Sequence, residues 1–155
     1  MDGRPVFEVG PLSSAIFRLA RLHKSIAARL LRESGLHPGQ ELVLMTLWRD
    51  GPQRQVDLVR TLDSDAPTMA RSIARLEKAG LVRRSPSPSD GRAVIVEATE
   101  ASLPLREKVE QAWATLERLT VDGLSPQRTS EALALLTELE AGLQAAAEQA
   151  HLDGH

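Results

Sequence analysis

The stretch QVDLVRTLDSDAPTMARSIARLEKAGLVRR, residues 55–84, decides the fold. Apolar residues at helical spacing predict a short helix that ends near Leu62. The run Asp63-Ser64-Asp65 then offers N-caps for a second helix, which Gly80 ends. Pro67 falls in the first turn of this second helix, where its missing N–H has no partner to lose. The stretch therefore predicts two short helices joined by a tight turn.

The two faces of this second helix carry different chemistry. Its predicted buried stripe consists of Met69, Ile73 and Leu76. The neighbouring outward stripe presents two hydroxyls and two guanidinium groups, on Thr68, Arg71, Ser72 and Arg75. Because an α-helix fits the DNA major groove, these groups are suited to guanine edges and phosphates. Taken alone, the four residues are more typical of an ordinary solvated helix face.

A β-hairpin is predicted directly after the second helix. Residues 81–84 and 93–96 have the pattern of two short strands, and two prolines and a glycine make residues 85–91 an exposed loop. Asp90 is placed to hold the guanidinium of Arg92 toward a phosphate or the minor groove. The alternative is a surface ion pair worth under ~1 kcal/mol.

Four more helices are predicted around this core, which makes the chain mainly α with a small β-hairpin, in one structural domain. Their start signals are Ser13 or Ser14, Pro38, Thr99 and Ser125. Gly35 and the pair Asp50-Gly51 are the stop signals of the first two. Pro104 is expected to bend the third or delay its onset. The polar tail, residues 149–155, is expected to fray.

The composition is that of a globular protein with an uneven charge distribution. The 155 residues are 42% hydrophobic and 26% charged, and their net charge is −2. Residues 54–92 hold eight Lys/Arg against five Asp/Glu, whereas residues 93–155 hold four against eleven. A polyanion would therefore be attracted to the middle of the chain and repelled by its end.

Several classes of protein are excluded. The absence of cysteine excludes a disulfide scaffold, a thiol nucleophile and a thiolate metal site. No apolar run approaches the ~18 residues that a membrane-spanning helix needs. The start MDGRPVFEVGPLSS lacks the layout of a signal peptide, so a cytoplasmic location is expected.

Residues 55–99 resemble the DNA-binding core of the MarR family of bacterial transcription regulators. The stretch LEKAGLVRR, residues 76–84, matches the family pattern. The family's wing signature runs Asp, any residue, Arg, five residues, Leu and Thr. It appears here at Asp90, Arg92, Ala98 and Thr99, with alanine in the place of leucine. The order and length of the flanking helices extend the resemblance to about residues 11–145.

The resemblance implies a winged helix-turn-helix homodimer that binds double-stranded DNA at a pseudo-palindromic operator. It divides the chain into an N-terminal arm and dimerisation helix (1–36), a DNA-binding lobe (37–98), and C-terminal dimerisation helices with the tail (99–155). The second helix of the quoted stretch would enter the major groove. The β-hairpin of residues 81–96, called the wing, would enter the minor groove. The residues expected to contact DNA are Pro67, Thr68, Arg71, Ser72, Arg75, Arg83, Arg84, Ser87, Asp90 and Arg92.

The resemblance also implies a repressor whose DNA complex is weakened by a small amphipathic or aromatic acid. Such a ligand would bind between the dimerisation helices and the DNA-binding lobe. The candidate ligand-binding residues are Phe17, Arg21, His23, Trp48 and Trp113. Each of them is also compatible with an ordinary core or helix position, and two Phe and two Trp in the whole chain cannot build a richly aromatic pocket.

Other functions have less support in the sequence. The main alternative is a winged-helix module that binds proteins without specific DNA binding, although such a module needs no arginines on the second helix or the hairpin. No enzyme is expected, because no Ser–His–carboxylate spacing, phosphate-cradling glycine loop or carboxylate pair stands out. No cofactor and no metal are expected, since the histidines at i, i+4 spacing, His151 and His155, lie in the polar tail.

Overall fold

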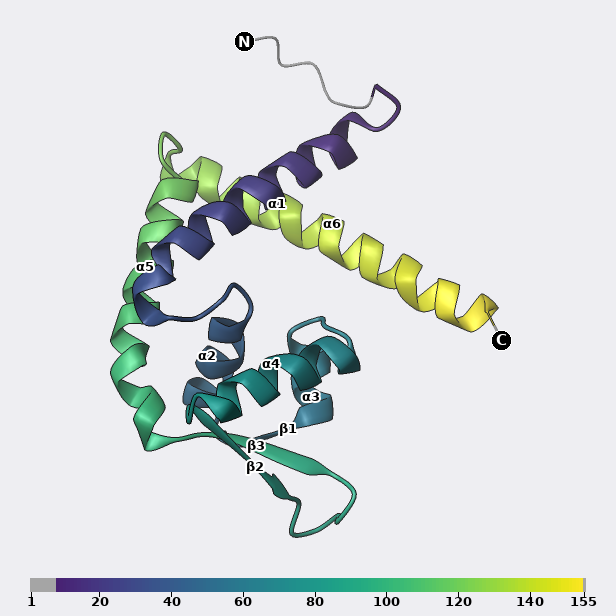
Figure 1. Cartoon of the computed structure of the whole chain (residues 1–155). Helices are drawn as coiled ribbons and strands as arrows, with labels where there is room; N and C mark the ends of the chain where they lie inside the picture. The colour runs from purple at the N-terminus through teal and green to yellow at the C-terminus, as the bar shows by residue number, and fades with distance from the viewer. Residues whose placement is uncertain (1–7, 155) are drawn as a thin grey trace. The chain divides into compact units, whose positions relative to one another are not determined.

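The computed structural model describes residues 8–154. Residues 1–7, which contain most of the expected N-terminal arm, and His155 lie outside the described residues. The described chain is mainly helical with a small antiparallel sheet, as predicted (Figure 1). Its elements are α1 (Pro11–Leu30), η1 (Arg32–Ser34), α2 (Gln40–Asp50), β1 (Gln53–Arg54), α3 (Gln55–Thr61), α4 (Ala66–Lys78), β2 (Val82–Pro86), β3 (Val94–Ala98), η2 (Glu100–Ser102), α5 (Leu103–Thr120) and α6 (Pro126–Asp153).

The sheet has three antiparallel strands in the order β1-β3-β2. In the hairpin, Val82 pairs with Ala98 and Pro86 with Val94. The prediction of a loop from residue 85 onward is therefore wrong for its first two residues, which continue β2. Pro86 is tolerated there because it ends an edge strand, where a proline without an N–H disturbs no central ladder.

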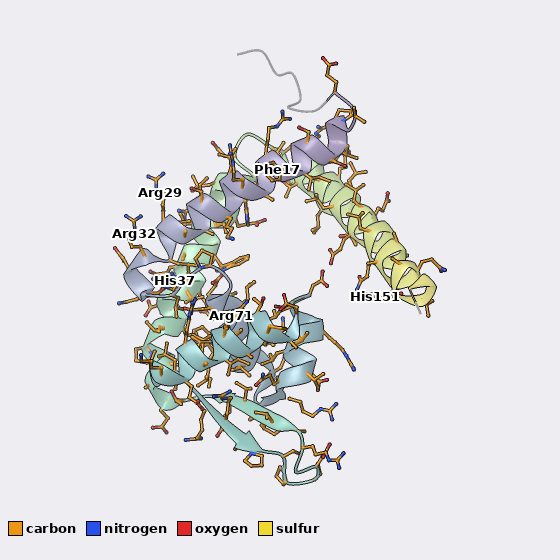
Figure 2. All side chains as sticks on the ribbon, turned by 45° about the vertical axis from the view of Figure 1, so that its right-hand side comes forward. Phe17, Arg29, Arg32, His37, Arg71 and His151 are labelled. Atoms are coloured by element: carbon orange, nitrogen blue, oxygen red, sulfur yellow. The ribbon has the colours of Figure 1, made fainter. Side chains whose placement is uncertain are left out.

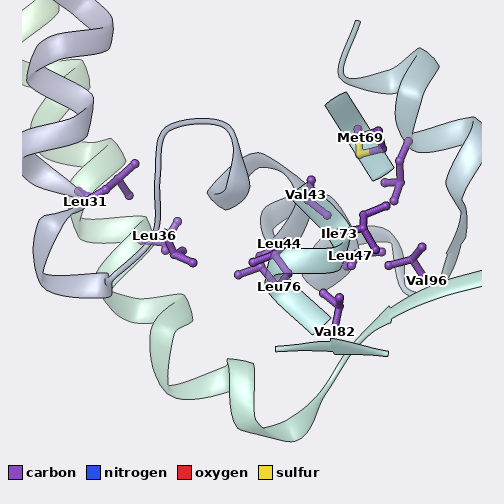
Figure 3. Packing of buried hydrophobic residues seen from close by; sticks show 13 residues of the cluster. Leu31, Leu36, Val43, Leu44, Leu47, Met69, Ile73, Leu76, Val82 and Val96 are labelled. Atoms are coloured by element: carbon purple, nitrogen blue, oxygen red, sulfur yellow. The ribbon is translucent and has the colours of Figure 1, made fainter. Parts of the chain in front are cut away.

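The core of the lobe joins α2 and α4 to the sheet. Leu44 and Leu47 of α2 pack with Ile73 and Leu76 of α4, and Val82 closes the cluster from β2 (Figure 3). The predicted inward stripe of α4 is thus confirmed, and its third member, Met69, is buried as well. The burial of these three residues determines which face of α4 is exposed to solvent.

Local capping explains two helix starts that the sequence predicts correctly. Asp65 is the N-cap of α4, with Pro67 in the first turn. Ser125 is the N-cap of α6, where its hydroxyl oxygen accepts a hydrogen bond from the backbone N–H of Arg128 at 3.1 Å. Each cap satisfies a backbone donor that the first helical turn leaves without a partner.

Two other predicted start signals are wrong. The N-cap of α1 is Gly10, with no side-chain cap, and the helix begins at Pro11. Proline is favoured at that position, so the helix starts before the predicted serine caps, and Ser14 is buried within it. Pro38 precedes α2 instead of lying in its first turn, because Gly39, with φ of +100°, is the N-cap.

The start of α5 differs from the prediction in a similar way. Thr99 is the N-cap of the 3-10 turn η2, not of α5, and its hydroxyl donates to the carbonyl oxygen of Gly80 at 2.6 Å. The helix begins at Leu103 with Pro104 in its first turn, where no N–H is needed. The extra turn delays the onset of the helix, as the proline predicts.

The chain divides into two compact units, of which the first ends at Leu116 and the second begins at Glu117. The second unit contains the end of α5 and all of α6. The tail was predicted to fray from Gln149 onward, but α6 continues to Asp153. The prediction is therefore wrong for residues 149–153. The alanines of its last turns are strong helix formers. No helix among residues 8–154 is both long and apolar enough to cross a membrane.

Candidate nucleic-acid interface

The first turn of α4 forms a small polar network on its outer side. Asp65 accepts hydrogen bonds from the backbone N–H and the hydroxyl of Thr68, both at 2.8 Å. These bonds lower the pKa of the Asp65 carboxyl, the backbone bond most strongly. The guanidinium of Arg71 donates to the Thr68 hydroxyl at 3.3 Å. The network orients Thr68 and Arg71, two of the four residues of the outward stripe.

The outward stripe of α4 is open to solvent. Thr68, Arg71 and Arg75 are exposed, and Ser72 is half-buried beside them. Within residues 8–154 neither arginine has a carboxylate within ion-pair distance. Both guanidinium groups therefore stand on one helix face outside ion-pair distance of a carboxylate, although Arg71 lies close enough to Asp65 to help lower the pKa of its carboxyl. Pro67 lies exposed at the start of the same helix, and Figure 2 shows Arg71 on α4.

The two hairpin arginines nearest to α4 are already paired. Arg83 donates through Nε to the carboxylate of Glu97, its neighbour across the hairpin, at 2.8 Å. Arg84 donates to Glu77 of α4 at 2.8 Å, and its backbone N–H donates to the same carboxylate. Arg84 lowers the pKa of the Glu77 carboxyl, mainly through the side-chain hydrogen bond. Each ion pair occupies the Nε and Nη2 side of its guanidinium, so fewer N–H donors of these two arginines remain for a phosphate.

At the wing tip, residues 87–92, side-chain oxygens accept hydrogen bonds from nearby backbone N–H groups. Ser87 is buried, and its hydroxyl oxygen accepts from the backbone N–H groups of Ser89 and Asp90. Asp90 in turn accepts from the backbone N–H of Arg92 at 3.1 Å. The expected ion pair between Asp90 and the Arg92 guanidinium does not form in the described chain, because the carboxylate caps the turn. The Arg92 guanidinium is exposed and, among the described residues, has no acidic partner.

One cation at this surface was not predicted. Arg54 lies in β1, pairs across the sheet with Ile95, and contributes to a pocket that Arg92 also lines. The sequence could have indicated Arg54 only through its position immediately before a helix. The strand that places it has two residues, which are too few for a periodic pattern. Its Nε donates to Asp57 at 3.2 Å.

The five candidate ligand-binding residues are spread over three helices of the first unit. Phe17 on α1 is 63% exposed, with Arg21 exposed and His23 half-buried on the same helix (Figure 2). Trp48 donates its indole N–H to the Ser102 hydroxyl at 3.0 Å, and Trp113 has a buried indole N–H without a partner. None of the five residues lines the pockets at α1 and α5, at the wing or beside the start of α2 in the described chain.

Comparison with known proteins agrees with this geometry. The sequence model of the MarR family matches residues 36–94. A probable transcriptional regulator from Pseudomonas aeruginosa is 31% identical, with a TM-score of 0.69 over 80% of this chain and 96% of that chain. BpsR of Bordetella bronchiseptica, whose DNA binding is regulated by 6-hydroxynicotinic acid, is 26% identical, with a TM-score of 0.77 over 83% and 98% of the two chains.

A structure bound to DNA has the same fold. A mutant MarR from E. coli in complex with operator DNA has a TM-score of 0.80 over 85% of this chain and 95% of that chain, and at 23% identity it shows the fold alone. The helix pair, the three-stranded wing and the flanking helices are thus shared with known regulators, and the family match spans the outward stripe of α4. The chain belongs to the MarR family of winged-helix, DNA-binding transcription regulators.

Proposed function

We propose that the protein is a dimeric, sequence-specific repressor that binds a pseudo-palindromic operator in the cytoplasm. The observation that carries this proposal is the outward stripe of α4, where Arg71 and Arg75 are exposed and form no direct ion pair in the described chain. Guanidinium groups in this state bind guanine edges or phosphates without first breaking an internal ion pair.

The wing supplies a second contact. Arg92 reaches outward from the hairpin with its backbone fixed by Asp90, which suits a phosphate or the minor groove. Arg83 and Arg84 contribute after exchanging exposed ion pairs, which are weak in water. The complete proposed contact set is Pro67, Thr68, Arg71, Ser72, Arg75, Arg83, Arg84, Ser87, Asp90 and Arg92.

The proposed dimer rests on apolar helix faces that this chain does not cover. On α1, Leu12, Phe17 and Leu19 are exposed, and on α6, Leu133 and Leu143 are exposed. Leu12 and Leu19 are seven residues apart and therefore lie on one side of α1, and exposed leucines that share a helix face indicate a protein interface. We propose that residues 1–36 and 99–155 form it and that residues 37–98 bind DNA, with half-sites about one helical turn (~10 bp) apart.

A small amphipathic or aromatic acid is the proposed effector, in line with the regulation of BpsR by 6-hydroxynicotinic acid. Phe17, Arg21 and His23 would contact it from α1, and two tryptophans from α2 and α5. The buried, unpaired indole N–H of Trp113 favours a ligand that carries a hydrogen-bond acceptor. Binding to a conformation with a different lobe spacing would weaken the DNA complex.

The central test measures sequence preference. Wild-type protein selects duplexes from a random pool, and fluorescence anisotropy then compares the selected duplex with a scrambled one at several salt concentrations. Arg71→Ala and Arg75→Ala should each reduce the preference by about tenfold or more, since a bidentate base contact is worth about 1–3 kcal/mol. Arg128→Ala on α6 is the matched control and should leave the preference unchanged.

Two outcomes would contradict the proposal. Equal affinity of the wild type for selected and scrambled duplexes at every salt concentration would exclude specific regulation. An unchanged gel shift for the double variant Arg83→Ala/Arg92→Ala would favour the alternative of a winged-helix module that binds proteins.

A further inference from the structure

The hydroxyl group of Thr68, in the first turn of α4, lies between two groups of opposite hydrogen-bonding character. On one side it is 2.8 Å from a carboxylate oxygen of Asp65, and on the other it is 3.3 Å from Nη2 of Arg71. The second carboxylate oxygen of Asp65 accepts the backbone N–H of Thr68 at 2.8 Å. Because both oxygens of Asp65 are bonded to the same residue, its carboxylate is held in one orientation at the start of the helix.

These partners fix the direction in which the Thr68 hydroxyl forms its hydrogen bonds. An ionised carboxylate only accepts hydrogen bonds, and a guanidinium only donates them. The two bonds from Thr68 lower the pKa of the Asp65 carboxyl, which is therefore ionised at neutral pH. The single hydroxyl proton must then point to Asp65, and the hydroxyl oxygen accepts from Arg71. Thr68 consequently has no proton left for a phosphate or a guanine edge, and its oxygen can only accept from a further donor.

The free lone pair of the Thr68 oxygen is matched to the amino groups of the DNA bases. In the major groove, the donors are the exocyclic amino groups of cytosine and adenine, whereas guanine presents only acceptors. Nη2 of Arg71 carries two protons, so its bond to Thr68 leaves one for a base. The two side chains therefore present N–H donors on one side and an oxygen acceptor on the other.

One kind of base pair presents the complementary pattern. A G·C pair shows N7 and O6 of guanine as acceptors, followed by the N4 amino group of cytosine as a donor. O6 and N4 are partners in the Watson–Crick pair, so they lie about 2.7–3.2 Å apart. The Thr68 oxygen and Nη2 of Arg71 are 3.3 Å apart, which is close to this spacing. In an A·T pair the amino group lies between two acceptors, so the order of the three groups does not match.

Both side chains are accessible to a duplex. Thr68 and Arg71 are exposed on the outward stripe, in the first two turns of α4 (Figure 2 shows Arg71). Helix-turn-helix proteins contact base edges through the N-terminal residues of the helix that enters the major groove. The hydroxyl and the guanidinium therefore lie where base contacts are made.

We propose that Thr68 and Arg71 together read a single G·C base pair, with Arg71 donating to guanine and Thr68 accepting from the amino group of cytosine. Asp65 is a positioning residue, because it touches no base and holds the hydroxyl proton of Thr68 away from the DNA. The inference rests on the proposed function, since it names the base pair that this part of the outward stripe recognises.

The test measures binding to the selected duplex after the replacement of single base atoms. 7-Deazaguanine removes the N7 acceptor of a guanine, and 2-pyrimidinone in place of cytosine removes the N4 amino group. Each G·C pair is replaced in turn, and fluorescence anisotropy measures the affinity of the full chain. We expect one pair in each half-site at which either analogue weakens binding by the wild type about tenfold.

Variants then assign each base contact to a side chain. In Thr68→Val, which removes the acceptor at similar side-chain volume, 2-pyrimidinone at this pair should cause no further loss. 7-Deazaguanine should still weaken binding by Thr68→Val about tenfold, whereas Arg71→Ala should no longer respond to it. Because 2-pyrimidinone weakens base pairing for every variant alike, the comparison between variants isolates the contact.

Asp65→Asn tests the positioning role. Asparagine is as good an N-cap as aspartate, so urea unfolding should show unchanged stability. Its amide donates to the Thr68 oxygen and releases the hydroxyl proton toward the DNA, so the effect of 2-pyrimidinone should be lost as in Thr68→Val. Asp63→Asn is the matched control, because it removes a charge from the same turn at a residue whose φ of +49° suits asparagine. This control should keep the wild-type response to both analogues.

Three results would overturn the inference. These are the absence of a pair at which both analogues weaken binding, a persistent effect of 2-pyrimidinone in Thr68→Val, or a persistent effect in Asp65→Asn. If Asp65→Asn lost stability, the response of Thr68→Val would still decide the base contact. A wild type that does not distinguish selected from scrambled duplexes would contradict the proposed function, whereas a sequence preference without the shared G·C pair would contradict this inference alone.

Discussion

The leucines of the DNA-binding lobe and those of α6 occupy opposite environments. Leu44 and Leu58 are 0% exposed, whereas Leu133 and Leu143 are 66% and 67% exposed. Full burial of one leucine side chain stabilises a fold by roughly 1.5–3 kcal/mol, so the lobe has gained this energy and α6 has not. The core of the lobe is packed mainly within residues 37–98, with Val109 and Ala112 of α5 added to it, whereas α6 keeps exposed leucines.

The largest expected effect is the removal of a side chain from the lobe core. Ile73 is fully buried between α2 and the sheet, so Ile73→Ala leaves a cavity and should destabilise the protein by about 2–5 kcal/mol. Urea unfolding followed by circular dichroism measures the loss. The matched change on α6, Leu152→Ala, removes an exposed side chain and should cost less than about 0.5 kcal/mol. Equal costs at the two positions would invalidate the comparison.

The second prediction concerns association through α6. Leu133→Glu with Leu136→Glu places two charges on one exposed apolar face and should weaken the proposed dimer by about a hundredfold, since a charge cannot be buried without a partner. Sedimentation equilibrium measures the dissociation constant. Glu138→Gln on the same helix is the control and should leave the mass unchanged. A double variant that remains dimeric at wild-type concentrations would show that α6 does not form the interface.

The same contrast explains which parts of the fold could be predicted. The N-caps Asp65 and Ser125 and the buried stripe of α4 depend on spacing within a few residues, and these predictions are confirmed. Strand β1 depends on pairing with β3, some forty residues later in the chain, and two residues carry no periodic signal. The shifted starts of α1 and α2 reflect a glycine N-cap in each, which competes with nearby serine and proline signals.

The candidate site divides in the same way. Spacing places Arg71 and Arg75 on one outward face of α4 without knowledge of the fold. The partners of Arg83 and Arg84 could not be predicted, because the first depends on the hairpin register and the second on the packing of β2 near α4. The assignment of all ten proposed DNA contacts stays a prediction until binding is measured.

The third prediction separates free from paired arginines on the wing. Arg92→Ala should weaken binding to selected and scrambled duplexes alike by about tenfold and reduce the salt slope by about 1, because a phosphate contact carries no sequence information. Arg83→Ala should weaken binding less, since the arginine must first leave Glu97. Anisotropy at four salt concentrations measures both slopes. A larger loss for Arg83→Ala would mean that the ion pair opens on DNA.

The smallest expected effect returns to the lobe interior, where Glu41 is 3% exposed at the start of α2 and accepts the Gly39 N–H at 2.8 Å. Burial raises the pKa of its carboxyl, although hydrogen bonds from two backbone N–H groups oppose the shift. The folded state then holds this proton more tightly than the unfolded chain. The stabilising contribution of the protonated Glu41 is therefore complete below the unfolded pKa and is lost as the pH rises through the folded pKa.

Glu41→Gln keeps an acceptor for Gly39 without the charge. The variant should exceed the wild type in stability at pH 8 by up to about 1 kcal/mol, and the two should converge at low pH. Urea unfolding at a series of pH values measures the difference. Glu138→Gln, exposed on α6, should show no such convergence. A wild-type advantage that grows with pH would mean that the ionised Glu41 stabilises the lobe, and that its interior tolerates charge as readily as the surface of α6.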